Sequence, residues 1–260
     1  SWDVSLAEAF GRSIGKMGDE MDVTGWYAPA MNCHRSAFDG RNFEYYSEDG
    51  VLGGKIAAGS ICGVQEKGLY AYMKHFAMND QQVSQIEMLC TWSTEQAIRE
   101  IYLKPFELSV KDGGCRAAMA AWNYVGNQWA GSCNSLLNTV LRDEWGFRGM
   151  VITDGYHDSG YMDSDRAIRN GCDLMLKNID VATNHPTDQS SATGLLAMRK
   201  ACHNILYTVV NSRAYAPENL NPGMASWQIV LIVVDVVVAA AFLAVEVLIF
   251  KNYKKRKQAV

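Results

Sequence analysis

The sequence lacks the patterns that hold a metal ion, a phosphate group or a nucleic acid. Its seven cysteines include no Cys-x-x-Cys pair, and its five histidines are never spaced as zinc ligands. It has no glycine-rich phosphate-binding loop. Its formal net charge is −4, and no strongly basic patch lies outside the C-terminal tail. We therefore expect no metal, no cofactor, no disulfide framework and no nucleic-acid partner.

The N-terminus also lacks the features of an export signal. The chain begins Ser1-Trp2-Asp3, with no methionine, no basic segment and no apolar segment before a cleavage site. Its 260 residues are enough for one α/β barrel or two smaller domains. We interpret this start as the middle of a longer protein.

The C-terminus carries a long apolar run, residues 227–250, which as a helix can cross about 30 Å of hydrocarbon. Its Val, Ile, Leu and Phe residues favour insertion by roughly 5 to 10 kcal/mol in total, which exceeds the roughly 2.5 to 3.5 kcal/mol cost of a central acid such as Asp235. Glu246 lies nearer the end and costs less. A buried core helix is the alternative, but only a basic tail follows the run. The run therefore predicts a transmembrane helix that contacts a lipid bilayer.

Charge at the two ends of this run predicts its orientation. Trp227 marks one interface, and the basic residues of 251–260 mark the other as cytoplasmic. We expect a single-pass plasma membrane protein with the domain at 1–213 outside, a linker at 214–226, the transmembrane helix at 227–250 and a basic cytoplasmic tail at 251–260.

Helical and strand patterns alternate along the chain before the linker. The predicted helices cover 4–19, 51–65, 94–111 (capped by Ser93), 134–145, 164–170 and 190–212. The predicted strands cover 22–31, 69–76, 117–123, 149–154 and 172–176. This alternation predicts parallel βα units. Five strands are too few for a closed eight-stranded barrel, so the predicted fold is α/β, a partial (β/α)8 TIM-like barrel followed by a single C-terminal transmembrane helix.

Asp154 is the first candidate for chemistry, because it ends the most apolar predicted strand and precedes Gly155. An aspartate at the carboxyl end of a parallel strand faces the ligand crevice of an α/β fold. The alternative is that Asp154 caps a helix or begins a turn.

Other polar and aromatic residues fall at the ends of the neighbouring strands. Arg41 follows the first strand, Lys74 and His75 end the second, and Trp122 ends the third. Parallel strands bring these ends to one rim. Consecutive residues on a strand point to opposite faces, so Lys74 and His75 reach one site only if the strand end bends or bulges. Alone, each has a simpler interpretation: Arg41 as a solvated loop charge, His75 as a core histidine and Trp122 as core filling.

The motifs around these residues resemble glycoside hydrolase family 3, the β-glucosidase type, over about residues 1–213. They are Gly25-Trp26-Tyr27-Ala28-Pro29, Asn32, His34-Arg35, Gly40-Arg41-Asn42-Phe43-Glu44-Tyr45-Tyr46-Ser47-Glu48-Asp49, Lys74-His75-Phe76-Ala77, Asn79-Asp80, Arg99-Glu100-Ile101-Tyr102-Leu103-Lys104-Pro105-Phe106-Glu107 and Leu141-Arg142-Asp143-Glu144-Trp145-Gly146-Phe147.

The resemblance implies Asp154 as the catalytic nucleophile of a retaining glycosidase. It also implies Arg41, Lys74 and His75 as sugar-binding residues. We expect the two cations to keep Asp154 ionised, and the side chains of Met119 and Trp122 to suit the apolar face of a pyranose.

The chain departs from the family pattern at several places. Trp122 stands where the family commonly has a tyrosine that hydrogen-bonds the nucleophile, and an indole N–H can substitute as donor. Gly155 stands where a tryptophan usually forms part of the leaving-group site, a role we assign to Tyr156. The family's earlier barrel strands have no match, and neither has the domain that carries the acid/base glutamate. Some members place that domain before the barrel, an order that fits a barrel ending in a membrane helix.

We therefore predict a retaining, exo-acting β-glucosidase-like enzyme that hydrolyses terminal β-D-glucosyl residues through a covalent glycosyl-Asp154 intermediate. Its substrate is a β-glucoside or oligosaccharide, and its acid/base group comes from a domain absent from this chain. The alternative is a non-catalytic cell-surface carbohydrate-binding protein on a degenerate barrel. Activity on β-xylosides or N-acetylglucosaminides is a further alternative, although the Lys74-His75-Phe76-Ala77 segment favours the glucosidase branch over the N-acetylglucosaminidase branch.

Overall fold

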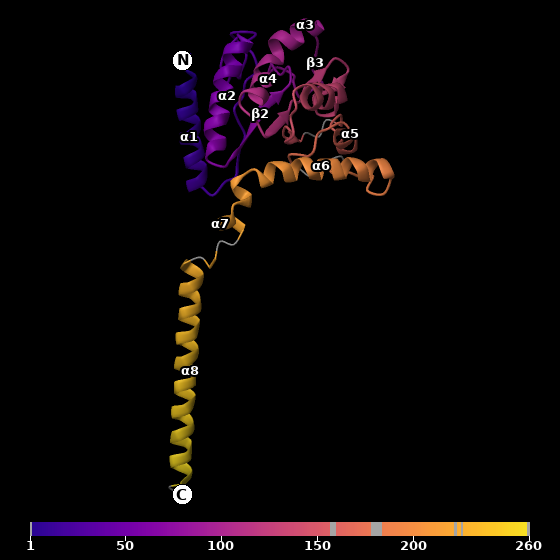
Figure 1. The fold of residues 1–260 in the computed structure, drawn as a ribbon. Coiled ribbons are helices and arrows are strands. Elements are labelled where there is room, and N and C mark those ends of the chain that lie inside the picture. Colours follow the sequence, from indigo (N-terminus) through magenta and orange to yellow (C-terminus); the bar gives the residue numbers. More distant parts are fainter. Residues whose placement is uncertain (1, 157–159, 178–183, 221–222, 225, 259–260) are drawn as a thin grey trace. The chain divides into compact units, whose positions relative to one another are not determined.

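The computed structural model describes residues 2–156, 160–177, 184–220, 223–224 and 226–258. The chain divides into two compact units, Ser1–Tyr215 and Ala216–Val260. Figure 1 traces the elements of each along the sequence.

The first unit contains a parallel sheet with strand order β1-β2-β4-β7. Its strands are β1 (Gly25–Trp26), β2 (Tyr70–Phe76), β4 (Ala117–Ala120) and β7 (Met150–Thr153). This sheet confirms the predicted α/β class and its parallel βα units. The predicted strands at 22–31 and 172–176 are shorter than expected: the first keeps two residues, and the second forms only the bridge between Leu174 and Ile152.

Helices connect the strands. The α-helices of this unit are α1 (Val4–Glu20), α2 (Gly50–Glu66), α3 (Glu95–Ala97), α4 (Lys104–Lys111), α5 (Ser164–Arg169) and α6 (Ala192–Val210). Two π-helical segments cover Ile98–Tyr102 and Ser135–Glu144, and short 3-10 turns cover Ala130–Ser132 and Arg213–Tyr215. For α1, α2, α5 and α6 the predicted bounds are confirmed to within two residues.

The predicted helix 94–111 is not continuous. It consists of α3, the π-helical segment and α4, with a break at Leu103. Pro105 follows this break, and a proline lacks the N–H that would continue the hydrogen bonds of a preceding helix. The cap is also one residue later than expected, because the Thr94 hydroxyl, and not that of Ser93, accepts from the Ala97 N–H at 3.3 Å.

A second, smaller sheet was not predicted. It contains β3 (Cys90–Thr91), β5 (Tyr124–Val125) and β6 (Gln128–Trp129), in the order β3-β5-β6. β5 and β6 form a hairpin whose turn includes Gly126 at φ +61°. The predicted strand 117–123 therefore ends at Ala120, and the chain enters this hairpin soon afterwards.

α1 and α2 pack closely because glycines face each other across the contact. A Cβ on Gly63 of α2 would lie 2.1 Å from the carbonyl oxygen of Glu8, and one on Gly11 of α1 would lie 2.2 Å from that of Ser60. No larger side chain fits at either position without moving one of the two helices.

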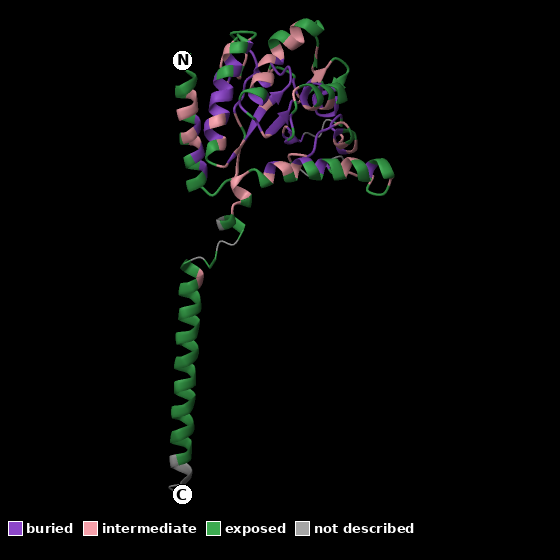
Figure 2. Cartoon of the chain, viewed as in Figure 1, coloured by how far each residue is buried: buried purple, intermediate pink, exposed green. Residues whose placement is uncertain are grey.

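Two apolar clusters lie on opposite faces of the sheet. The larger one packs helix residues such as Ile61 and Leu137 against alternate strand residues such as Val151. The smaller one joins residues from the other face of the strands, namely Tyr72, Ala117, Met119, Met150 and Ile152. Figure 2 shows the buried strands of this unit. Asp154 lies two residues after Ile152, so strand alternation places it on the side of the smaller cluster.

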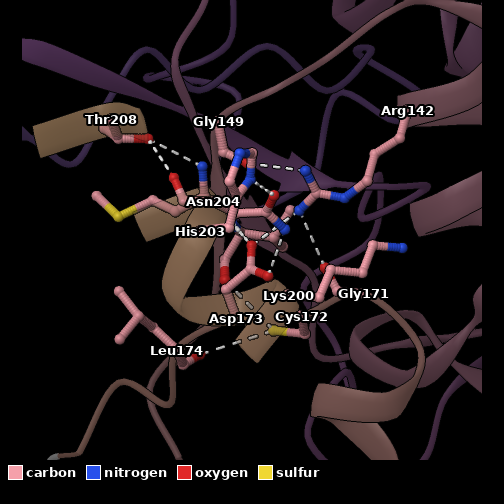
Figure 3. Close-up of polar contacts among 12 residues, drawn as sticks. Arg142, Gly149, Gly171, Cys172, Asp173, Leu174, Lys200, His203, Asn204 and Thr208 are labelled. Atoms are coloured by element: carbon pink, nitrogen blue, oxygen red, sulfur yellow. Dashed lines mark hydrogen bonds and ion pairs between the residues drawn. The ribbon is translucent and has the colours of Figure 1, made fainter. Parts of the chain in front are cut away.

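A buried ion pair attaches α6 to the sheet (Figure 3). Arg142 donates to the carboxylate of Asp173 at 2.8 Å, and the two side chains are only 8% and 3% exposed. Asp173 also accepts from the Val151 N–H and from the Asn204 amide of α6, each at 2.8 Å. Thr208 of α6 donates its hydroxyl to the Arg116 carbonyl at 2.7 Å.

The end of the first unit is fastened to its beginning through Arg213. Its N–H donates to the Gly68 carbonyl at 2.7 Å, and its guanidinium donates to the Val23 carbonyl at 3.0 Å. The same guanidinium forms an ion pair with Asp19 at 2.9 Å.

The second unit contains α7 (Pro217–Leu220) and the long helix α8 (Ser226–Gln258). α8 is long and apolar enough over Ser226–Lys254 to cross a membrane, and none of that span is buried in the structure. Its exposed surface is green in Figure 2.

Candidate functional site

Asp154 directly follows β7 and is held by backbone contacts on both sides. Its N–H donates to the Ala120 carbonyl at 3.1 Å, which fixes it to the end of β4. Its Oδ1 accepts from the Gly155 N–H at 2.6 Å. Within the described ranges, its buried Oδ2 accepts no hydrogen bond. One carboxylate oxygen is therefore fixed by a hydrogen bond, while the other is left without one.

His75 contacts the second oxygen of this carboxylate. Its Nε2 lies 3.6 Å from Oδ2 of Asp154, and its side chain is only 2% exposed. Asn32 fixes the backbone of His75 from both sides: its amide nitrogen donates to the His75 carbonyl at 3.0 Å, and its amide oxygen accepts from the His75 N–H at 2.7 Å.

Lys74 and His75 both reach the site although they are consecutive on one strand. The pairing of β2 with β4 shifts register between Met73 and Phe76, so the strand end is irregular where these two residues lie. Two consecutive strand residues reach one site only where the strand bends or bulges, and this irregularity meets that condition. Lys74 lies 3.4 Å from the carboxylate of Glu44, and the Nε of Arg41 donates to the other oxygen of the same carboxylate.

Burial and charge set the protonation of the two central groups. Burial raises the pKa of Asp154 above its ordinary value, although the Gly155 N–H and the charges of Arg41 and Lys74 act in the opposite direction. Burial also lowers the pKa of His75 well below its ordinary value, and the same two cations lower it further. His75 is therefore a neutral imidazole at neutral pH, with one N–H to donate.

Met119 lies on β4 and Trp122 lies just after it, and the two side chains have different surroundings. Met119 is buried in the small apolar cluster beside Ile152, its partner on β7. Trp122 is partly exposed, and its indole N–H donates to the Gly155 carbonyl at 2.6 Å. The expectation that this N–H replaces a tyrosine hydroxyl on the Asp154 carboxylate is therefore wrong: it holds the peptide after Asp154 instead.

Two residues of the site were missed as functional by the sequence reasoning. Glu44 forms ion pairs with both Arg41 and Lys74. The sequence feature that could have indicated this role is an acid three residues after the arginine. Asn32 orients His75 and appeared only as part of a motif. Within the described part of the chain, no three His, Cys, Asp or Glu side chains converge as metal ligands.

The chain is similar to known carbohydrate-active proteins. The profile described as "Glycosyl hydrolase family 3 N terminal domain" matches residues 1–200. The chain is 42% identical over 154 residues to beta-glucosidase A of Butyrivibrio fibrisolvens, a match that covers 59% of this chain and 18% of that protein. It is 37% identical over 174 residues to a beta-glucosidase of Rhizobium radiobacter, covering 67% and 21%.

Solved structures agree with these sequence matches. The structure of beta-glucosidase 3B from Thermotoga neapolitana in complex with glucose aligns with a TM-score of 0.74 at 32% identity, over 84% of this chain and 31% of that one. Beta-glucosidase from Kluyveromyces marxianus in complex with glucose gives a TM-score of 0.74 at 28% identity. The first unit therefore has the α/β fold of these proteins. The chain spans about a fifth of the length of the curated relatives it matches.

Proposed function

The chain belongs to glycosyl hydrolase family 3, and we propose that it supplies the nucleophile side of a retaining, exo-acting β-glucosidase-like active site. The observation that carries this proposal is the state of Asp154. One of its oxygens is held by the Gly155 N–H, while the other is buried, free of hydrogen bonds among the described residues and beside His75.

The reaction follows from this geometry. Oδ2 of Asp154 attacks the anomeric carbon of a terminal β-glucosyl residue, forms a bond to it and displaces the leaving-group oxygen. Water then hydrolyses the glycosyl–Asp154 ester. The first step needs an acid that gives a proton to the leaving-group oxygen, and the second needs a base that takes a proton from the attacking water as the Asp154 carboxylate is released. We assign this acid/base group to a domain outside this chain.

The surrounding residues bind the sugar in this proposal. Neutral His75 donates a hydrogen bond to a sugar hydroxyl, and Lys74 and Arg41 donate further ones. Their positive charges also favour the ionised form of Asp154, which is the form that attacks. Glu44 keeps the two cations in place through its two carboxylate oxygens. Trp122, which is partly exposed, supplies apolar surface for the pyranose ring, whereas Met119 is 3% exposed and packs in the small apolar cluster instead.

Covalent trapping tests the proposal without the missing acid. When a 2-fluoro glucoside carries a good leaving group, that group departs without an acid and the 2-fluoroglucosyl group stays on the nucleophile as a stable ester, so mass spectrometry of the labelled full chain identifies the nucleophile. We expect label on the peptide that contains Asp154, none after Asp154→Asn, and full label after the control Asp143→Asn, which changes an exposed aspartate. Label on another peptide would refute the assignment. Glucose binding without any label would instead support the carbohydrate-binding alternative.

We also propose that α8 anchors the protein in the plasma membrane, with the first unit outside and the basic end in the cytoplasm. The support is the length and apolar character of α8 and the lysines at its C-terminal end. Resistance to extraction with carbonate, together with protease access to the first unit on intact cells, is the expected result. Release by carbonate would refute the anchor.

A further inference from the structure

The apolar part of α8, residues 227–250, carries few polar side chains, and they fall on one line. Between Trp227 and Phe250 the polar residues are Gln228, Asp235 and Glu246. An α-helix turns about 100° per residue, so Gln228 and Glu246, which are eighteen residues apart, point in about the same direction. Asp235 lies about 20° from that direction. The rest of the helix surface over this range is apolar.

We propose that this line of polar residues is the contact between two parallel copies of α8 in the membrane. The inference rests on the proposed insertion of α8. Two copies inserted in the same orientation meet along a two-fold axis, which places each residue of the line opposite itself at the same depth. Ala239 and Phe242 continue the line at the three- and four-residue spacing of a left-handed helix pair.

The hydrogen-bonding groups of these polar residues favour a second copy of α8 as the partner. A glutamine amide both donates and accepts hydrogen bonds, so two copies of Gln228 are complementary to each other. A carboxyl group accepts hydrogen bonds and, in its protonated form, also donates one, so two copies of Asp235 or of Glu246 can hydrogen-bond to each other. Among the described residues, neither Asp235 nor Glu246 has an ion pair or hydrogen bond, and acids inside hydrocarbon characteristically face other protein groups.

Three consecutive alanines provide a matched test by cysteine cross-linking. Ala239 lies about 20° from the Gln228 direction, whereas Ala241 lies about 140° from it on the other side of the helix. The full chain is placed in lipid vesicles, with the exposed Cys90 and Cys202 changed to serine in every variant. On oxidation we expect Ala239→Cys to give a covalent dimer and Ala241→Cys to remain a monomer. Equal cross-linking of both variants, or none at Ala239→Cys, would overturn the proposal.

Energy transfer between labelled copies, measured while the chain is diluted into lipid, tests the polar contact itself. We expect Asp235→Leu to weaken dimerisation by about 3- to 30-fold, the range known for hydrogen bonds between membrane helices, and Asp235→Asn to preserve it. Dimerisation unchanged by Asp235→Leu would overturn the proposal. So would a monomer that associates only with an added transmembrane peptide carrying lysine at the depth of Asp235, because that result would mean a basic partner.

Carbonate extraction separates this inference from those it builds on. A chain that stays in the membrane but remains a monomer refutes the dimer and leaves the anchor intact. A chain that carbonate releases refutes the anchor and the dimer together. Labelling of Asp154 by the 2-fluoro glucoside is independent of both outcomes.

Discussion

Replacing Arg142 by methionine should destabilise the first unit strongly, and more at high pH than at low pH. The change leaves the carboxylate of Asp173, which is 3% exposed, without its cation, and it removes the hydrogen bond from Arg142 to the Gly149 carbonyl at 2.9 Å. Breaking a buried ion pair by removal of one partner costs about 3 to 5 kcal/mol of unfolding free energy.

The pH dependence follows from the pKa of Asp173. Burial raises this pKa to about 6 even with Arg142 present. A raised pKa means that the folded state binds the proton more tightly than the unfolded state, so the associated stability is present at acid pH and is lost as the pH rises through about 6. The shift of about two units corresponds to about 3 kcal/mol. Without Arg142 the pKa of Asp173 rises further. Keeping Asp173 ionised at pH 8 therefore costs the variant more unfolding free energy than it costs the original protein.

Hydrogen exchange of amides in α6 and β7, corrected for intrinsic rates, measures the effect on the full chain. At pH 8 we expect the opening free energy to fall by about 3 to 5 kcal/mol, and at pH 5, where Asp173 is protonated, by only about 1 to 2 kcal/mol for the lost hydrogen bonds. Adding Asp173→Asn should restore part of the loss at pH 8. Arg148→Met, which changes an exposed arginine over the Tyr207 ring, is the control. An equal loss at both pH values would refute the electrostatic account.

Three further results are expected. The rate of covalent labelling should fall as the pH drops through the raised pKa of Asp154, with a midpoint above the ordinary carboxyl value of about 3.9; a rate that does not depend on pH would contradict an ionised nucleophile. Gly63→Ala should lower the thermal unfolding temperature, because its Cβ would collide with the Glu8 carbonyl. Asn32→Ala should slow labelling by releasing the backbone of His75, whereas Asn32→Asp, which keeps one acceptor, should slow it less.

Much of the fold follows from local signals in the sequence. α1 and α2 have helical apolar spacing and start at the caps Asp3 and Asp49, whose side chains accept the first helix N–H groups. The short apolar run before Asp154 predicts a buried strand, which is β7. Asp154 favours turns, so it predicts where that strand ends. The nearness of Asp154 to His75 also follows in part, since they lie at the same end of two parallel strands, β7 and β2, that are separated only by β4.

Other features depend on information that local patterns do not carry. The segment 172–176 has strand composition, yet only Leu174 forms a bridge to the sheet, and pairing depends on the neighbouring strand. The β5–β6 hairpin had a local signal, a Gly-Asn turn at Gly126, between two strands too short to show alternation. The role of Glu44 depends on the irregular end of β2, which places Lys74 beside it. The direction of the Trp122 indole likewise depends on where the Gly155 carbonyl lies.

The fastening of Arg213 has a mechanical consequence. Arg213 lies two residues before the C-terminal end of the first unit, so tension applied through α8 reaches the first unit near this residue. Its contacts with Asp19, Val23 and Gly68 resist the pull at the end of α1 and the start of β2, and so carry the load before it reaches α6 and the β7 edge. A protein held at one end would thereby keep mechanical strain away from Asp154 until the Arg213 contacts give way.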